Sequence, residues 1–167
     1  MSATAKAAHV WARDALDWYV EPEVATDALL AVERFTGIVL DPCCGGGNIP
    51  RALIRAGYDA IGSDITTRAG SAGQPWFMGE RDFLTQESAA NICMNPPFFK
   101  AKGAEAFIRH ALAITSGKVA ALVDIRFLTG SERARGLWAD HPPARAYIVT
   151  PRVSCPPGTY LTAGGKA

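Results

Sequence analysis

The sequence lacks the features that mark membrane, secreted and metal-binding proteins. None of its apolar runs approaches the roughly 18 consecutive residues that a membrane-spanning helix requires, and no apolar run follows the basic residues of the first 13 positions. Its four cysteines form no Cys-x-x-Cys pair, and no histidine stands near them at the spacing of a metal ligand. We therefore expect a cytoplasmic protein with no membrane anchor, no disulfide framework and no metal.

The chain also has little net charge, +1 over 167 residues, but the two signs are unevenly distributed. Residues 1–95 carry seven basic and twelve acidic side chains, whereas residues 96–152 carry nine basic and four acidic ones. The average argues against a strongly basic nucleic-acid-binding protein. The basic segment, residues 96–152, is nevertheless a candidate surface for a polyanionic partner.

The remaining composition is that of a globular protein. A length of 167 residues with 49% hydrophobic residues predicts a single domain over residues 1–167 that fills its own core. Short apolar runs alternate with helical patterns, which indicates a doubly wound α/β fold with a mostly parallel central sheet and helices on both faces. The expected strands are 37–41, 60–64, 76–79, 91–94, a buried central strand at 118–127, and 144–150, and the expected helices are 24–35, 49–56 and 104–115.

Acidic side chains stand at the ends of three successive expected strands, at Asp41, Asp64 and Asp82. In an open α/β sheet a ligand binds beyond the carboxyl ends of the strands. A carboxylate there would repel a phosphate, but in this order the three can accept hydrogen bonds from an ammonium group, from ribose hydroxyls and from an adenine amino group. Such a ligand is S-adenosylmethionine (SAM), although each acid alone also fits a solvated strand end or a helix cap.

The loop that follows Asp41 has the sequence Pro-Cys-Cys-Gly-Gly-Gly. Gly45 and Gly47 have no Cβ and can take up positive φ, so a ligand can approach the backbone closely. A dinucleotide-binding loop would have a third glycine where Pro50 stands, and a P-loop would continue with Gly-Lys-Ser or Gly-Lys-Thr. The sequence therefore disfavours NAD and FAD and excludes a P-loop.

The segment Asn95-Pro96-Pro97-Phe98 follows the expected strand at 91–94. Alone it also fits a turn, because two prolines restrict the backbone. The series DPCCGGG, GSDI, RDF and NPPF, in this order, resembles the class I SAM-dependent methyltransferases. NPPF is similar to the signature of their amino-methylating branch, chiefly the adenine-N6 DNA enzymes of phage and prophage type. The resemblance covers residues 19–152 and implies a Rossmann-like methyltransferase fold.

The resemblance also implies which residues bind SAM and its product, S-adenosylhomocysteine (SAH). Asp64 would bind the ribose, Ile65 would pack on the adenine, and Cys43 stands where the family often has an aromatic residue. Residues 19–22 resemble the segment that covers the cofactor in N6-adenine enzymes, although a plain lead into the first helix fits equally. The expected cofactor-binding residues are Tyr19, Glu21, Pro22, Asp41, Pro42, Cys43, Gly45, Gly47, Asp64, Ile65, Asp82, Phe83 and Asn95.

The expected catalytic residues are Asn95, Pro96, Pro97 and Phe98. The lone pair of an exocyclic amine is delocalised into the base, so the nitrogen must become pyramidal before it attacks a methyl group. The Asn95 side-chain oxygen and the Pro96 carbonyl can each accept one amino hydrogen, and Phe98 can stack on the base. Alignment of the reacting atoms then replaces a strong general base.

A base within a duplex cannot reach such a site, so a DNA substrate would have to be flipped out and held through its phosphates. We therefore expect nucleic acid, and DNA before RNA, as the partner. The expected substrate-binding residues are Phe98, Lys100, Lys102, Arg126 and Arg133. Residues 126–138 either close over the substrate or pack Leu137 and Trp138 inward.

The sequence departs from the family in two ways. No stretch is long enough for a separate target-recognition domain, so sequence specificity would come from short loops, from a second subunit, or be absent. The aromatic-rich last strand of the family is missing, so we expect an incomplete C-terminal antiparallel strand. The sequence leaves three alternatives open: an RNA adenine methyltransferase, a protein glutamine methyltransferase, and a non-catalytic SAM- or nucleic-acid-binding subunit.

Overall fold

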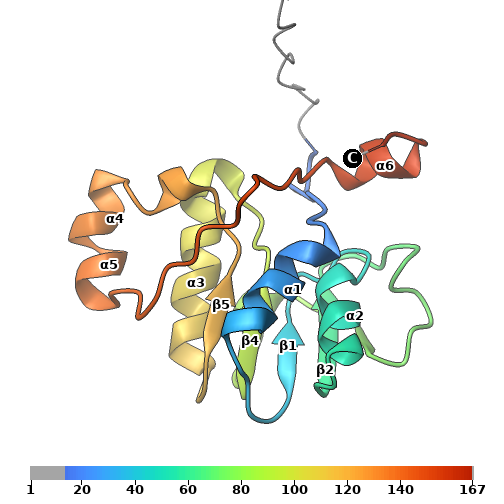
Figure 1. Ribbon diagram of the computed structural model, residues 1–167, viewed down its shortest axis with the longest axis horizontal. Helices are drawn as coiled ribbons and strands as arrows, with labels where there is room; N and C mark the ends of the chain where they lie inside the picture. The colour runs from blue at the N-terminus through green and yellow to red at the C-terminus, as the bar shows by residue number, and fades with distance from the viewer. Residues whose placement is uncertain (1–13, 167) are drawn as a thin grey trace, which may run out of the picture.

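The structure is a computed structural model that describes residues 14–166 (Figure 1). Residues 1–13, in which the sequence predicts no signal peptide, lie outside the described residues. The strands are β1 (Val39–Asp41), β2 (Ala60–Asp64), β3 (Phe77–Glu80), β4 (Asn91–Met94) and β5 (Val119–Ala121). The α-helices are α1 (Glu23–Val32), α2 (Asn48–Arg55), α3 (Lys102–Ile114), α4 (Ser131–Arg135), α5 (Leu137–Asp140) and α6 (Gly158–Thr162). The 3₁₀ helices are η1 (Phe83–Thr85), η2 (Phe99–Ala101) and η3 (Ile125–Phe127).

The five strands form one parallel sheet in the order β3-β2-β1-β4-β5. The chain runs outward from β1 through β2 to β3 and then returns to place β4 on the other side of β1. This reversal creates a switch point at the carboxyl ends of β1 and β4, where ligands bind in open α/β sheets. The predicted parallel α/β fold is confirmed.

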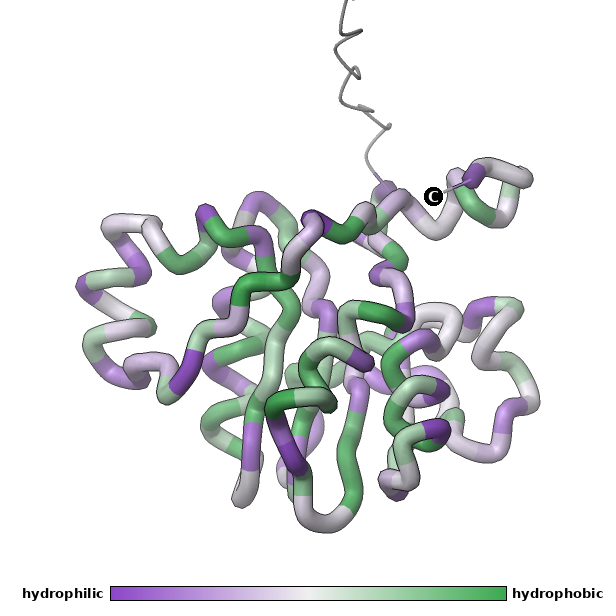
Figure 2. Tube along the Cα trace, viewed as in Figure 1, coloured by the Kyte–Doolittle hydropathy of each residue, from purple (hydrophilic) through white to green (hydrophobic). Residues whose placement is uncertain are grey.

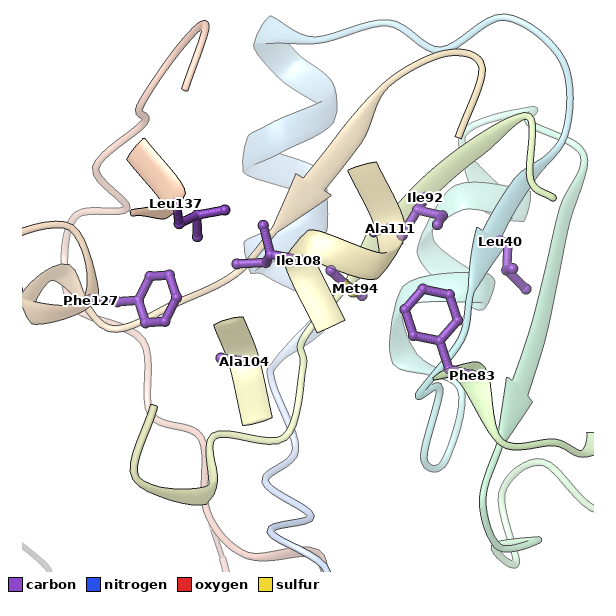
Figure 3. Close-up of a cluster of buried hydrophobic side chains, with 9 residues drawn as sticks. All are labelled: Leu40, Phe83, Ile92, Met94, Ala104, Ile108, Ala111, Phe127 and Leu137. Atoms are coloured by element: carbon purple, nitrogen blue, oxygen red, sulfur yellow. The ribbon is translucent and has the colours of Figure 1, made fainter. Parts of the chain in front are cut away.

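Helices cover both faces of the sheet, because neighbouring strand residues point to opposite sides. One core cluster joins the strands to α3 and α5 and contains Leu40, Phe83, Ile92, Met94, Ala104, Ile108, Ala111, Phe127 and Leu137 (Figure 3). The other joins the strands to α1 and α2 and contains Leu30, Phe35, Val39, Ile49, Leu53, Ala60 and Cys93. Hydrophobic residues accordingly run along β1 in the middle of the sheet (Figure 2).

The prediction of a buried central strand at 118–127 was wrong. Only β5 forms within this run, and it is a half-buried edge strand. The extended backbone ends at Asp124, whose carboxylate accepts a hydrogen bond from the Arg126 N–H (2.9 Å) and caps η3. A capping acid thus stops a strand that the apolar residues alone would have continued.

The prediction of a strand at 144–150 was also wrong. Arg145 and Tyr147 of this segment bind the carboxylate of Glu33, at the end of α1, so the segment crosses the molecule as an extended strap (Figure 1). Within residues 14–166, β5 is the last strand of the sheet on its side, and no antiparallel strand pairs with it. In the same range, no helix has the length and hydrophobicity to cross a membrane.

Candidate active site

A cavity of about 220 Å³ lies at the carboxyl ends of the strands, beside the switch point. Its walls are residues 16–21, residues 42–46 after β1, the ends of β2 and β3, and the start of the segment after β4. Its polar side chains are Asp17, Glu21, Asn48, Asp64, Arg68, Arg81, Asp82 and Asn95. The structure therefore brings together Asp64, Asp82 and Asn95 at the cavity, whereas Asp41, the first of the three predicted acids, is buried and does not line it.

Cys43 of the glycine loop contacts Asp41 at the end of β1 and Asn95 after the end of β4. Asp41 is buried, and its carboxylate accepts hydrogen bonds from the N–H (3.3 Å) and the thiol (3.8 Å) of Cys43. The same thiol lies 3.4 Å from the backbone carbonyl of Asn95, so Cys43 connects the loop after β1 with the end of β4. Burial, followed by the charge of Asp41, raises the pKa of the Cys43 thiol well above its ordinary value.

Two tryptophans pack on the glycines of this loop. Gly45 and Gly47 have φ of +50° and +90°, as their role in a tight loop predicts. A Cβ on Gly45 would lie 2.5 Å from the indole of Trp18, and one on Gly47 would lie 2.2 Å from that of Trp76. The close approach that the sequence assigned to a ligand is therefore made by Trp18 and Trp76, and Gly47 lies outside the cavity.

The side-chain amide of Asn95 has a defined orientation. Its Nδ2 group donates one hydrogen bond to the carbonyl of Tyr19 (2.8 Å) and another to the carboxylate of Glu21 (2.9 Å). Because both partners are acceptors, the amide nitrogen must face them. No donor among the described residues bonds to Oδ1, so this oxygen is available as an acceptor in the cavity that Asn95 lines.

Two buried acids at this end of the cavity, Glu21 and Asp41, have raised pKa values. Burial raises the pKa of Glu21 to about 7, against the opposing effect of the Asn95 hydrogen bond. Burial and the charge of Glu21 raise the pKa of Asp41 well above its ordinary value. A cation in the cavity would favour the charged form of both groups. Residues 14–166 contain no group of three or more side chains that could hold a metal ion.

Asp64 at the end of β2 has lone pairs left for a ligand. Its Oδ2 accepts from the Gly45 N–H (2.8 Å) and its Oδ1 from the Thr66 N–H (3.1 Å). Since each carboxylate oxygen can accept two hydrogen bonds, both can also accept from hydroxyl groups. The next residue, Ile65, lines the cavity and is 54% exposed, which leaves an apolar surface beside this carboxylate.

Asp82 and Phe83 differ in their surroundings. Asp82 lines the cavity and caps η1 by accepting from the Leu84 N–H (3.0 Å). Phe83 contributes to the cavity wall, but its ring is buried in the core, 5.1 Å from that of Phe107 between centroids. Asp82 is therefore the accessible polar group of this pair.

The four residues of the predicted catalytic motif do not share one environment. Asn95 and Pro97 line the cavity, whereas Pro96 is buried and does not. The structure does not bring Phe98 into the cavity either. Its ring packs edge-on against Phe127, with 6.0 Å between centroids, next to the core cluster of Figure 3.

Phe99 occupies the position that the sequence assigned to Phe98. It lines the cavity and is 44% exposed. Its φ is +38°, in a region that L-residues seldom adopt, and its N–H donates to the carboxylate of Asp17. This unusual backbone conformation turns the chain after Phe98, so the second phenylalanine faces the cavity.

The four basic residues predicted to bind substrate lie outside the cavity. Lys100 and Lys102 are exposed beyond it. Arg126 pairs with the acid that caps η3 (2.8 Å), and the guanidinium of Arg133 lies 4.3 Å from the centroid of the Phe127 ring. These two arginines therefore have intramolecular partners.

Two further predictions concern residues at the edges of the site. Pro22 caps α1 and does not line the cavity, unlike Tyr19 and Glu21 of the same segment. Leu137 is fully buried and Trp138 packs against the same core cluster. Of the two alternatives for residues 126–138, the inward packing of these side chains is the one observed.

The cavity residues that sequence reasoning missed include Trp18, Arg68, Arg81 and Phe99. The aromatic pair formed by Trp18 and Tyr19, directly before the predicted covering segment, was the one available signal. Arg68 stacks on the indole of Trp18, 4.2 Å from the ring centroid. Because these residues are far apart in the sequence, no local pattern predicts this contact.

The raised pKa of Glu21 predicts a pH-dependent stability. In the unfolded chain Glu21 ionises near 4.5 and in the folded chain near 7, so the folded state loses stability as the pH rises through this window. The difference corresponds to about 3 kcal/mol. Glu21→Gln retains an acceptor for Asn95 and removes the titration. We expect it to exceed the wild type in unfolding free energy by up to about 3 kcal/mol near pH 8 and to match it near pH 4.5, as measured by urea denaturation.

Glu23→Gln is the matched control, because the ion pairs of Glu23 with Arg51 and Arg55 lower its pKa. This variant should not gain stability at high pH. A Glu21→Gln variant with the pH dependence of the wild type would contradict the assignment.

Comparisons with known proteins bear on the fold. No family model and no curated protein sequence matches the chain. Nineteen solved chains do match, among them TrmN from Thermus thermophilus, with 23% identity and a TM-score of 0.51 over 80% of this chain and 45% of that one. A TehB-like SAM-dependent methyltransferase from Corynebacterium glutamicum matches with 19% identity and a TM-score of 0.46, over 65% of this chain and 70% of that one. The match thus covers less than half of TrmN, and the chain shares the Rossmann-like α/β fold of that part.

Proposed function

We propose that the protein is a SAM-dependent methyltransferase that modifies an exocyclic amino nitrogen, and that its substrate is adenine N6 in DNA. The observation that carries the proposal is the Asn95 amide, whose nitrogen is bound by Tyr19 and Glu21 while its oxygen stays available in an acidic cavity. An acceptor oxygen in a fixed position is what an amine needs if its hydrogens are to be held during methyl transfer.

The chemistry of the cavity fits SAM. The buried carboxylates of Glu21 and Asp41 favour a ligand that carries positive charge. The remaining lone pairs of Asp64 suit ribose hydroxyls, and the exposed side chain of Ile65 offers an apolar surface to the adenine ring. The carboxylate of Asp82 lies at the same end and can accept from the adenine amino group.

The residues after β4 would prepare the acceptor. SAM, when bound, supplies a methyl group on a positively charged sulfur. The Oδ1 of Asn95 would accept one amino hydrogen, which helps to localise the nitrogen lone pair. Because Tyr19 and Glu21 fix the amide in advance, no reorientation is needed during the reaction. The methylated nitrogen would lose its proton to solvent water, so no strong base has to act before the methyl transfer.

Phe99 supports a planar substrate. Its exposed ring lines the cavity next to Pro97 and can stack on a base that has left its helix. Lys100 and Lys102 follow directly and are exposed, so they can meet the flanking phosphates of the same strand. This juxtaposition favours a nucleic acid over a protein glutamine, and the available Asn95 oxygen favours an enzyme over a non-catalytic subunit.

The assignment of Asn95 is tested by transfer of labelled methyl groups from SAM. We expect label in adenine N6 of unmethylated DNA, and an at least about 100-fold lower turnover for Asn95→Ala, because one fixed polar contact to the reacting group is lost. Circular dichroism, which should match that of the wild type, controls for the folding of the variant. Incorporation at the wild-type rate would contradict the catalytic role, and label found only in RNA or in glutamine would contradict the DNA substrate.

The assignment of Phe99 is tested by comparing it with its neighbour. Phe99→Ala should raise the KM for nucleic acid about tenfold, since stacking on a base contributes about 1–3 kcal/mol, and should leave thermal unfolding unchanged. Phe98→Ala should instead lower the unfolding free energy by about 2 kcal/mol, because this ring packs in the core. A larger effect of Phe98 than of Phe99 on KM would mean that the two roles are exchanged.

A further inference from the structure

Positive φ angles in residues other than glycine occur at a single contact of the described chain. Within residues 14–166 only Asp17, Phe99 and Lys100 have them, with φ of +55°, +38° and +59°. The N–H of Phe99 donates to the carboxylate of Asp17, and both residues line the cavity. Such angles cost free energy in L-residues, so they persist only where the surrounding structure imposes them, and they are most common at functional sites.

Asp17 is held in place by the turn to which it belongs. Its N–H donates to the carbonyl of Asp14 (3.1 Å), and the Asp14 carboxylate accepts from the N–H of Trp18 (3.2 Å). The other oxygen of that carboxylate accepts from the hydroxyl of Thr159 in α6 (3.0 Å), which ties the turn to the end of the described chain. Asp17 is itself buried. Its carboxylate therefore contacts Phe99 from a fixed position.

The contact with Asp17 does not bury the Phe99 ring. The ring lies against Gly103 in the first turn of α3, where a Cβ would come within 2.7 Å of ring atom Cδ2. Phe99 nevertheless stays 44% exposed, whereas the neighbouring Phe98 packs against Phe127. Packing in the core would favour an inward ring. A buried carboxylate that fixes an exposed ring therefore indicates a role in binding.

We propose that Asp17 is a positioning residue, whose carboxylate fixes the Phe99 backbone so that the ring is ready to stack on the substrate base. The inference rests on the proposed function. A ring that is already in place loses less conformational entropy when a base stacks on it. The same segment holds the Asn95 amide through Tyr19 and Glu21, so it would fix both the acceptor oxygen and the stacking surface.

The first test is a double-mutant cycle on methyl transfer to unmethylated DNA. Glycine and asparagine both tolerate positive φ, but only asparagine keeps an acceptor oxygen. Asp17→Gly should raise the KM for DNA about tenfold, as Phe99→Ala does, and change the KM for SAM by less than about twofold. Asp17→Asn should restore most of the affinity for DNA. The double variant Asp17→Gly/Phe99→Ala should have the KM of Phe99→Ala alone, because Asp17 acts through the ring.

The second test is amide hydrogen exchange of the free protein, which needs no substrate. The Phe99 N–H should exchange at least about tenfold more slowly than in an unstructured peptide, because a hydrogen bond to a charged acceptor protects it. Asp17→Gly should remove this protection, and Asp17→Asn should keep most of it. The Ile92 N–H in β4, which donates to the carbonyl of Lys118 (2.8 Å), is the internal control and should stay protected in every variant.

An unchanged KM for DNA in Asp17→Gly would overturn the inference. A double variant in which the effects of the two substitutions multiply would also overturn it, because Asp17 would then act independently of the ring. An unprotected Phe99 N–H in the wild type would overturn it whether or not the variants fold. Absence of methyl transfer to DNA by the wild type would instead overturn the proposed function, and the exchange rates would still report on the contact with Asp17.

Discussion

Two hydrogen bonds donated by one amide group connect the start of the described chain with the end of β4. The Nδ2 of Asn95 reaches the Tyr19 carbonyl and the Glu21 carboxylate, and both acceptors belong to the segment that leads into α1. Without this contact the amide could turn, and its oxygen would have no fixed direction. The buried charge of Glu21 makes the arrangement costly, as its pKa of about 7 indicates. Such a cost at a buried polar group is typical of a site at which chemistry takes place.

The two ends of the described chain contact each other beside the cavity that Trp18 and Tyr19 line. Tyr19 forms an antiparallel bridge with Pro157, and the N–H of Gly158 donates to the carbonyl of Trp18 (2.9 Å). A Cβ on Gly158 would lie 2.2 Å from the Trp18 indole, so Trp18 is enclosed between Gly158 and Gly45. The position of the covering segment therefore depends on the tail of the chain, which reaches it through the strap that replaces the expected last strand (Figure 1).

The sequence predicted the elements whose signals are local. The apolar run before Asp41, the glycine loop and the helix after it follow from residue order alone, and so does the position of Asn95 directly after a strand. The sequence could not predict that Phe99, rather than Phe98, lines the cavity. This difference depends on the positive φ of Phe99, whose N–H donates to the carboxylate of the distant Asp17. The strand expected at 144–150 failed for a similar reason. Its alternation of residues fits a strand, but the distant Glu33 binds two of its side chains.

A crystal structure of the protein with SAH tests the proposed site directly. We expect the ribose hydroxyls to lie on the Asp64 carboxylate and the adenine to lie on Ile65, while Nδ2 of Asn95 keeps its bonds to Tyr19 and Glu21 and Oδ1 faces the sulfur. An Asn95 amide turned away from the sulfur, or an SAH molecule bound outside this cavity, would rule out this arrangement.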